Sequence, residues 1–157
     1  MTRFPKFCAA GIRLGRSSLM MVFILGFISC RAVEERMLVS LLDYYVAAQE
    51  ALAEDNYGEA KTSLQALANE GEGELQVLAE KAAACTDIKA MREEFQFLSK
   101  SLVKMKLPQG YVLASCRHGD EEGLSWVQKD AEIMNPYHGS SNLRCGSIEK
   151  KAEMPAR

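Results

Sequence analysis

Apolar side chains recur at helical spacing along the middle of the chain. Between residues 37 and 53 the apolar positions are three, four or seven residues apart: Leu38, Leu41, Leu42, Tyr45 and Leu52. This spacing lines one face of a helix, and side chains on such a face normally pack into a core. We therefore predict a first helix from Met37 to about Ala53, which Asp55 and Asn56 end.

A second helix is expected directly after this break, because Asn56 and Glu59 have the spacing of a capping box. Its inner face is predicted to carry five residues: Tyr57, Ala60, Leu64, Leu67 and Ala68. Gly71–Gly73 then interrupts the pattern, since glycine weakens a helix interior by about 1 kcal/mol. A third helix is predicted over residues 75–85, with three inward residues: Leu75, Leu78 and Ala82.

The fourth segment has the cleanest apolar stripe. It is expected to start near Thr86–Asp87 and to carry six inward residues: Ile88, Met91, Phe95, Leu98, Leu102 and Met105. Leu107–Gly110 ends it, because proline cannot continue the helical hydrogen bonding and glycine frees the turn. Helical segments with such short connections predict an antiparallel helical bundle.

After the fourth segment the helical pattern is lost. Tyr111–Leu113 is a short β-like run, and Gly119–Gly123 and Asn135–Pro136 have the composition of turns. The predicted fold class is mainly α, a helical bundle with an irregular C-terminal cap that contains short β-like segments. We place this domain at residues 37–148 and a flexible tail at 149–157.

The N-terminus has the pattern of a targeting segment. Four basic residues precede the apolar run Leu19–Ile28, and no acidic residue occurs before Glu34. The run is shorter than the roughly 20 apolar residues that a membrane-spanning helix needs. Ser29–Cys30 directly follows it and resembles a bacterial lipobox, although Phe27 stands where that pattern prefers Leu. The resemblance implies cleavage before Cys30 and a lipid, such as palmitate, on its sulfur.

This interpretation makes residues 1–29 a lipoprotein signal peptide and residues 30–36 a tether. The domain is then anchored to a membrane of the bacterial cell envelope and faces the periplasm; ordinary signal cleavage and an uncleaved anchor are the alternatives. The chain has 19 Lys and Arg against 21 Asp and Glu, and four of the basic residues precede Cys30. The remaining 15 basic and 21 acidic residues give a net charge of −6. Such a charge argues against nucleic acid as a partner and does not hinder cation binding.

Several motifs in the second half occur in a recognisable order. Arg92–Ser99 has the form Arg-x-x-Phe-x-x-Leu-Ser, and Ile133–Gly139 has the form Ile-x-Asn-Pro-Tyr-x-Gly. Together with Cys116, Trp126 and Cys145–Gly146, they resemble an uncharacterised bacterial domain of unknown function. That domain is found in periplasmic proteins and lipoproteins, and at the end of some heavy-metal efflux adaptor subunits. The likeness covers about residues 38–148 and implies handling of a soft metal, with an efflux complex or another envelope protein as partner.

The sequence departs from this family at two positions where sulfur would be expected. Arg117–His118 replaces a Pro-Met pair, and Asn142 replaces the Met before the last cysteine. One hypothesis is a metal site made of thiolates from Cys116 and Cys145 and an imidazole from His118. His138 is a further candidate ligand; sulfur and imidazole donors suit copper or zinc.

The alternative hypothesis is a structural disulfide between Cys116 and Cys145, the default state of cysteines in an oxidising compartment. It would close a loop of about 30 residues and stabilise the fold by roughly 3–4 kcal/mol. Five neighbouring residues are then structural: Trp126, Asn135, Pro136, Tyr137 and Gly139. Neither Ser99 nor Ser125 has a nucleophile elbow or a placed base, so no catalytic residue is predicted. We favour soft-metal binding or an accessory role in heavy-metal efflux, with a non-catalytic envelope interaction domain as the alternative.

Overall fold

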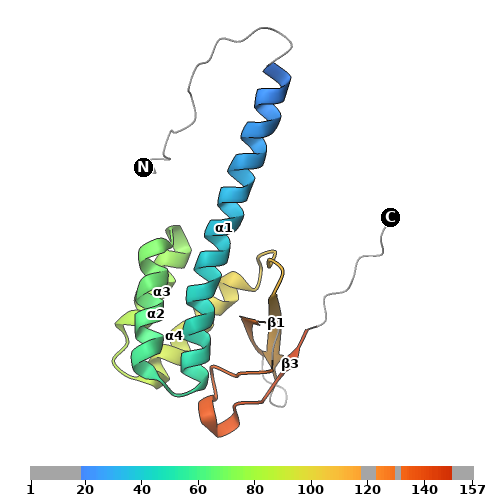
Figure 1. Ribbon diagram of the computed structural model, residues 1–157. Coiled ribbons are helices and arrows are strands. Elements are labelled where there is room, and N and C mark those ends of the chain that lie inside the picture. Colours follow the sequence, from blue (N-terminus) through green and yellow to red (C-terminus); the bar gives the residue numbers. More distant parts are fainter. Residues whose placement is uncertain (1–18, 118–122, 130–131, 150–157) are drawn as a thin grey trace. The chain divides into compact units, whose positions relative to one another are not determined.

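The computed structural model describes residues 19–117, 123–129 and 132–149, with backbone only for residues 19–34. The chain divides into two units, residues 1–36 and 37–157, and the core, the sheet and the candidate site described below lie in the second unit. The elements in chain order (Figure 1) are α1 Leu19–Ala53, α2 Tyr57–Glu70, α3 Gly73–Ala84, α4 Ile88–Leu102, β1 Tyr111–Cys116, β2 Leu124–Lys129, the 3-10 helix η1 Gly139–Asn142, and β3 Ser147–Ile148. The predicted fold class, mainly α with short β segments in a C-terminal cap, is confirmed.

The first helix differs most from its predicted extent. It begins at Leu19 instead of Met37, so the residues predicted as a tether, 30–36, have helical backbone. No helix in the described part of the chain is both long enough and apolar enough to cross a membrane. Residues 1–18 lie outside the described residues, and the signal peptide and the lipid on Cys30 stay predictions.

Side-chain caps fix where two of the helices begin. The Asn56 carboxamide accepts a hydrogen bond from the Glu59 backbone N–H (3.2 Å) and donates one to the Glu59 carboxylate (2.8 Å). Asn56 therefore caps the first turn of α2, as predicted. The second half of a capping box is replaced, because the Asn56 backbone N–H donates to the Ala51 carbonyl (2.8 Å) and Glu59 binds the Asn56 side chain instead. Asp87 caps α4 in the same way, because its carboxylate accepts a hydrogen bond from Ala90 N (2.9 Å).

The main hydrophobic core lies between the helices and one side of the sheet. Its largest fully buried side chains from the helices are Leu42, Tyr45, Leu52, Leu64, Leu67, Met91, Phe95, Leu98 and Leu102. The buried residues of α3 are all alanines: Ala79, Ala82 and Ala83. Leu75 and Leu78 of the same helix are half-buried and pack against the edge of the core. Met105 lies beyond the end of α4 and is 44% exposed, so its predicted inward position is wrong.

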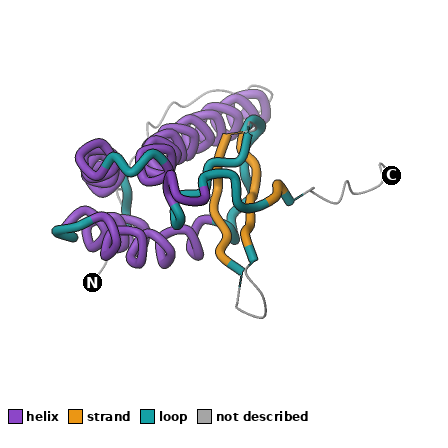
Figure 2. The backbone as a smooth tube through the Cα atoms, turned by 90° about the horizontal axis from the view of Figure 1, so that it is seen from below, coloured by secondary structure: helices purple, strands orange, loops and turns teal. Residues whose placement is uncertain are grey.

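The C-terminal region forms a three-stranded antiparallel sheet in the order β2-β1-β3. Figure 2 shows the strands side by side next to the helices, and α4 packs against β2. The register sets Ala114 of β1 opposite Trp126 of β2 and Ile148 of β3. The sequence predicted only the first half of β1, and β2 and β3 were missed. The predicted turn 119–123 lies outside the described residues except for Gly123.

Candidate metal centre

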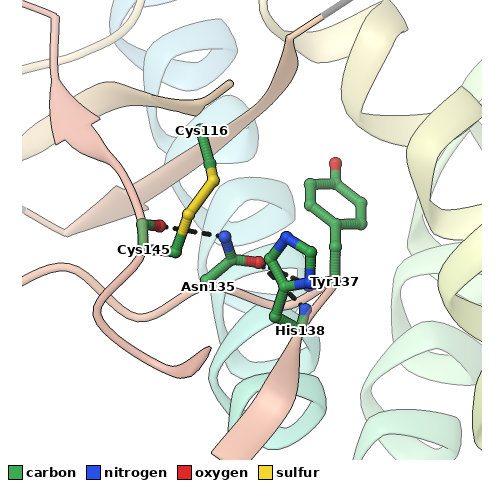
Figure 3. Close-up of a disulfide and its surroundings, with 5 residues drawn as sticks. All are labelled: Cys116, Asn135, Tyr137, His138 and Cys145. Carbon is green, nitrogen blue, oxygen red and sulfur yellow. Dashed lines mark hydrogen bonds between the residues drawn. A yellow bond between two sulfur atoms is a disulfide. The ribbon is translucent and has the colours of Figure 1, made fainter. Parts of the chain in front are cut away.

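A disulfide joins the two cysteines of the cap (Figure 3). Cys116 is the last residue of β1, Cys145 precedes β3, and their Sγ atoms are 2.03 Å apart. The two backbones are brought together by the pairing of β1 with β3, in which Ser115 is opposite Ser147. Cys116 is buried and Cys145 is half-buried. The disulfide that the sequence offered as one of two alternatives is therefore present.

The same cysteines also belong to a group of potential metal ligands. The ligand atoms of Cys116, His138 and Cys145 all lie within 4.8 Å of one another, and Figure 3 shows the three side chains around Asn135. His118, the imidazole that the sequence favoured, lies outside the described residues. Asn142, which replaces the expected Met, is exposed, and its backbone carbonyl accepts a hydrogen bond from Cys145 N (3.0 Å). The structure thus brings together three of the four predicted ligands.

The donor set fits a soft or borderline metal ion. Two sulfur donors and one imidazole nitrogen suit copper(I), or zinc with one more ligand. With Zn–S bonds of about 2.3 Å, two thiolates on a tetrahedral ion are about 3.8 Å apart. The sulfurs of Cys116 and Cys145 are bonded at 2.03 Å. The disulfide and the metal complex are therefore mutually exclusive states of the same two residues.

Asn135 holds the backbone around this group. Its side-chain oxygen accepts hydrogen bonds from Tyr137 N (2.8 Å) and His138 N (3.1 Å), and its Nδ2 donates to the Cys145 carbonyl (2.9 Å). Its own N–H donates to the Leu143 carbonyl at 2.8 Å. Asn135 is completely buried, so each of these bonds replaces a contact with water that the side chain has lost. One amide group therefore fixes both His138 and Cys145 at their backbones.

Aromatic side chains connect the site to the helical core. Trp126 is fully buried, and its ring meets the Tyr137 ring edge-on, with centroids 6.0 Å apart. Tyr137 is 6.3 Å from Phe95, which stacks on Tyr45 at 4.8 Å. These rings form a continuous series from the cap into the helical core. Trp126 and Tyr137, for which the sequence predicted structural roles, are both members of this series.

The hydroxyl groups of Tyr45, which is fully buried, and of Tyr137, which is half-buried, are hydrogen-bonded. Tyr137 Oη donates to the Ser125 carbonyl (3.0 Å), and Tyr45 Oη lies 2.7 Å from Ser99 Oγ. Burial raises the pKa of both phenols well above their ordinary value, since the charged phenolate would lose its hydration. Both therefore stay neutral at physiological pH and act as packing and hydrogen-bonding residues.

An ion pair that the sequence did not reveal fastens the cap to the helices. Arg92 of α4 pairs with Asp55, which follows α1, at 2.5 Å. Arg92 Nε donates to the Pro136 carbonyl (2.8 Å), and Asp55 accepts a hydrogen bond from Ser140 N (3.0 Å). The Arg92 guanidinium, followed by the Ser140 hydrogen bonds, lowers the pKa of Asp55 to about 2. The arginine of the Arg-x-x-Phe motif was the only available signal, and its partner Asp55 was interpreted only as a helix break.

The glycines of the two cap motifs are required by close contacts. Gly139 has φ +59°, and a Cβ atom there would overlap with both Arg92 and Asp55. Gly146 has φ +134°, and a Cβ atom there would lie 2.8 Å from the Ser115 carbonyl oxygen and 2.9 Å from the Trp126 ring. Residues with a side chain rarely adopt either conformation, and the close contacts add to this cost. The structural role predicted for Gly139 therefore has a direct cause, the ion pair behind the turn.

An open groove of about 620 Å³ borders the disulfide. Besides the two cysteines, five residues line it: Ser115, Arg117, Gly146, Ser147 and Glu149. Cys85 lies elsewhere, at the end of α3, as a free and half-buried thiol. Burial, followed by the nearby carboxylates of Glu94 and Asp87, raises its pKa and keeps it protonated.

Comparison with protein-family models, curated proteins and solved structures finds no match to this chain.

Proposed function

We propose that this protein binds one soft metal ion, copper(I) or zinc, through Cys116, Cys145 and His138 when its disulfide is reduced. The observation that carries the proposal is the convergence of the three ligand atoms within 4.8 Å. A dithiol reductant supplies two electrons and two protons, becomes a disulfide itself and leaves both cysteines as thiols. The thiols then lose their protons as the ion binds, so binding is strongest above neutral pH.

The proposed binding is tested by titrating the purified protein with zinc, and anaerobically with copper(I), against chromophoric chelators. We expect one ion per reduced chain and at least tenfold weaker binding by the oxidised chain, in which neither sulfur is a thiolate. Cys145→Ser and His138→Ala should each weaken binding. Cys85→Ser is the matched control, since it removes a thiol outside the group and should change nothing.

Three results would contradict the metal proposal. The first is an absence of stoichiometric binding by the reduced protein. The second is equal binding by reduced and oxidised protein, because the ion would then use ligands other than the two thiolates. Loss of binding in Cys85→Ser would likewise assign the ion to a different site.

The second candidate is a non-catalytic interaction domain of the cell envelope, in which the disulfide only stabilises the cap. The observation in its favour is the disulfide itself, which joins β1 to the segment before β3. Under this proposal the reduced protein loses stability and takes up no ion. The partner would be an efflux complex or another envelope protein, as the family resemblance implies, and pull-down with the oxidised domain should capture it while the reduced domain does not.

We also propose that the chain is a lipoprotein anchored through Cys30 and facing the periplasm. The support is the order of a basic segment, an apolar run and Ser29–Cys30 in the sequence. Labelled palmitate should be incorporated by the wild-type protein in bacterial cells and not by Cys30→Ser. Incorporation that persists in Cys30→Ser would contradict the anchor without bearing on the metal site.

A further inference from the structure

The turn that carries His138 is fastened on both sides to one ion pair. Before His138, the Pro136 carbonyl accepts a hydrogen bond from Arg92 Nε at 2.8 Å. After it, Ser140 donates to Asp55 from its backbone N–H at 3.0 Å and also from its hydroxyl group. The backbone on either side of the imidazole is thus tied to the same pair of charged groups.

The ion pair is itself fixed to the helical part of the molecule. Arg92 belongs to α4, and its Nη2 donates to the carbonyl of Leu52 in the last turn of α1 at 2.5 Å as well as to Asp55. The Arg92 side chain is only 16% exposed, so little of its guanidinium is left to water. Gly139 runs so close to both partners that a Cβ atom would displace them. The turn therefore rests directly on Arg92 and Asp55.

These contacts do not depend on the disulfide. The hydrogen bonds from Arg92, from Ser140 and to Asn135 all involve backbone, carboxylate, guanidinium or amide atoms. Asn135 also holds the Cys145 carbonyl at 2.9 Å. Reduction changes none of these atoms, so the same hydrogen bonds are available to the backbones of His138 and Cys145 in the reduced protein. A ligand whose backbone is already ordered loses less freedom when the ion binds.

We propose that Arg92 and Asp55 are positioning residues of the metal site, which hold His138 in place for the ion once the disulfide is reduced. This inference rests on the proposed metal-binding function. Neither residue is offered as a ligand; each acts through the turn. Supporting groups around metal ligands typically contribute about 10- to 100-fold to metal affinity.

The test compares two aspartates that make similar ion pairs. Asp55→Asn removes the negative charge of the carboxylate to which both Arg92 and Ser140 donate. Asn also tolerates the positive φ of 59° at this position. Asp43→Asn is the matched control: Asp43 pairs with Lys129 at 2.6 Å and is 52% exposed, against 41% for Asp55. We expect the zinc affinity of the reduced protein to fall about tenfold in Asp55→Asn and to be unchanged in Asp43→Asn.

A double-mutant cycle separates positioning from a general loss of structure. If Asp55 acts through His138, Asp55→Asn should have no further effect on zinc affinity in a His138→Ala background. X-ray absorption of the zinc complex should then show fewer nitrogen neighbours in Asp55→Asn and the same two sulfurs. Arg92→Lys should weaken binding similarly, because lysine lacks the fork that reaches Pro136 and Asp55 together.

The possible failures are distinguishable. If reduced wild-type protein takes up no zinc, the proposed function fails and this inference fails with it. If wild-type protein binds zinc and Asp55→Asn binds it as tightly as Asp43→Asn, the metal site stands and the positioning role is overturned. An equal loss of affinity with and without His138 also overturns it, since the effect would not pass through the imidazole.

Discussion

The helical region and the C-terminal cap are held together by different means. Among the described residues, the main core contains 20 that are buried, nearly all from the helices, whereas the cluster inside the cap has three: Ala114, Cys116 and Trp126. Burial of apolar surface is the largest stabilising term in a fold. The helical region therefore gains much stability from its hydrophobic core, and the cap gains little from its own. The cap compensates with a disulfide, an ion pair and the hydrogen bonds of Asn135. The candidate metal site lies in the region that is held together by polar contacts and a disulfide, without a large hydrophobic core.

The largest expected effect on stability comes from Phe95, a residue of α4 that contacts aromatic rings of both regions. Phe95 stacks on Tyr45 in the helical core and lies 6.3 Å from Tyr137 of the cap. Phe95→Ala should lower the free energy of unfolding by about 3–5 kcal/mol, since it leaves a cavity in close-packed surroundings. Urea denaturation followed by circular dichroism measures this change.

A second phenylalanine on the same helix provides the control. Phe97 is 52% exposed, and Phe97→Ala should change the free energy of unfolding by less than about 0.5 kcal/mol. Equal losses from the two substitutions would contradict the assignment of Phe95 as the link between the regions.

Removing the disulfide should separate the two regions. The double variant Cys116→Ser/Cys145→Ser opens a loop with a sequence separation of 29 residues. The chain-entropy model gives a cost of about 3–4 kcal/mol for such a loop. The loss should fall on the cap, because its own buried cluster is small. Amide hydrogen exchange should therefore accelerate in β1, β2 and residues 132–149, while α2 and α3 keep their protection.

The alternative outcome is equally clear. If exchange accelerates uniformly over helices and cap, the two regions unfold as one cooperative unit and the contrast between them has no energetic meaning. Cys85→Ser serves as the control for the loss of a thiol, since Cys85 is not in the disulfide.

The same contrast explains what the sequence revealed. The helices and the Asn56–Glu59 cap were predicted because an inward face repeats every 3.6 residues and caps have local signatures. In β2, by contrast, Trp126, Val127 and Gln128 are all buried in succession. A strand covered on both faces lacks the alternation by which strands are recognised, so β2 was missed.

The candidate site was predictable only in part. Cys116 and Cys145 stood out as residue types with special chemistry and Asn135 as part of a turn motif, and the structure brings them together. The Arg92–Asp55 pair did not, because 37 residues separate its members and each is an ordinary charged residue in sequence. The position of His138 near the cysteines also depends on how the Asn135 turn folds back, and this is set by tertiary contacts.

The smallest expected effect concerns pH. The pKa of Asp55 falls from its usual 3.8 to about 2 because Arg92 and Ser140 hydrogen-bond its carboxylate. A carboxyl group with a lowered pKa in the folded state stabilises the fold above its unfolded pKa, and this contribution is lost as pH falls. The loss should therefore occur between about pH 4 and pH 2. Asp55 is 41% exposed, so solvent screening limits the effect to about 1 kcal/mol or less.

Comparing wild type with Asp55→Asn isolates this contribution. The difference in free energy of unfolding, from urea titrations at several pH values, should be largest above pH 4 and shrink toward zero as the pH falls to 2 and below, because the wild-type carboxyl group then becomes neutral as well. A difference that stays constant across this range would mean that Asp55 acts through shape and hydrogen bonding, independent of its charge. The ion pair would then fasten the cap no more strongly than a neutral contact does, and the weakness of polar fastening would explain why the cap also needs its disulfide.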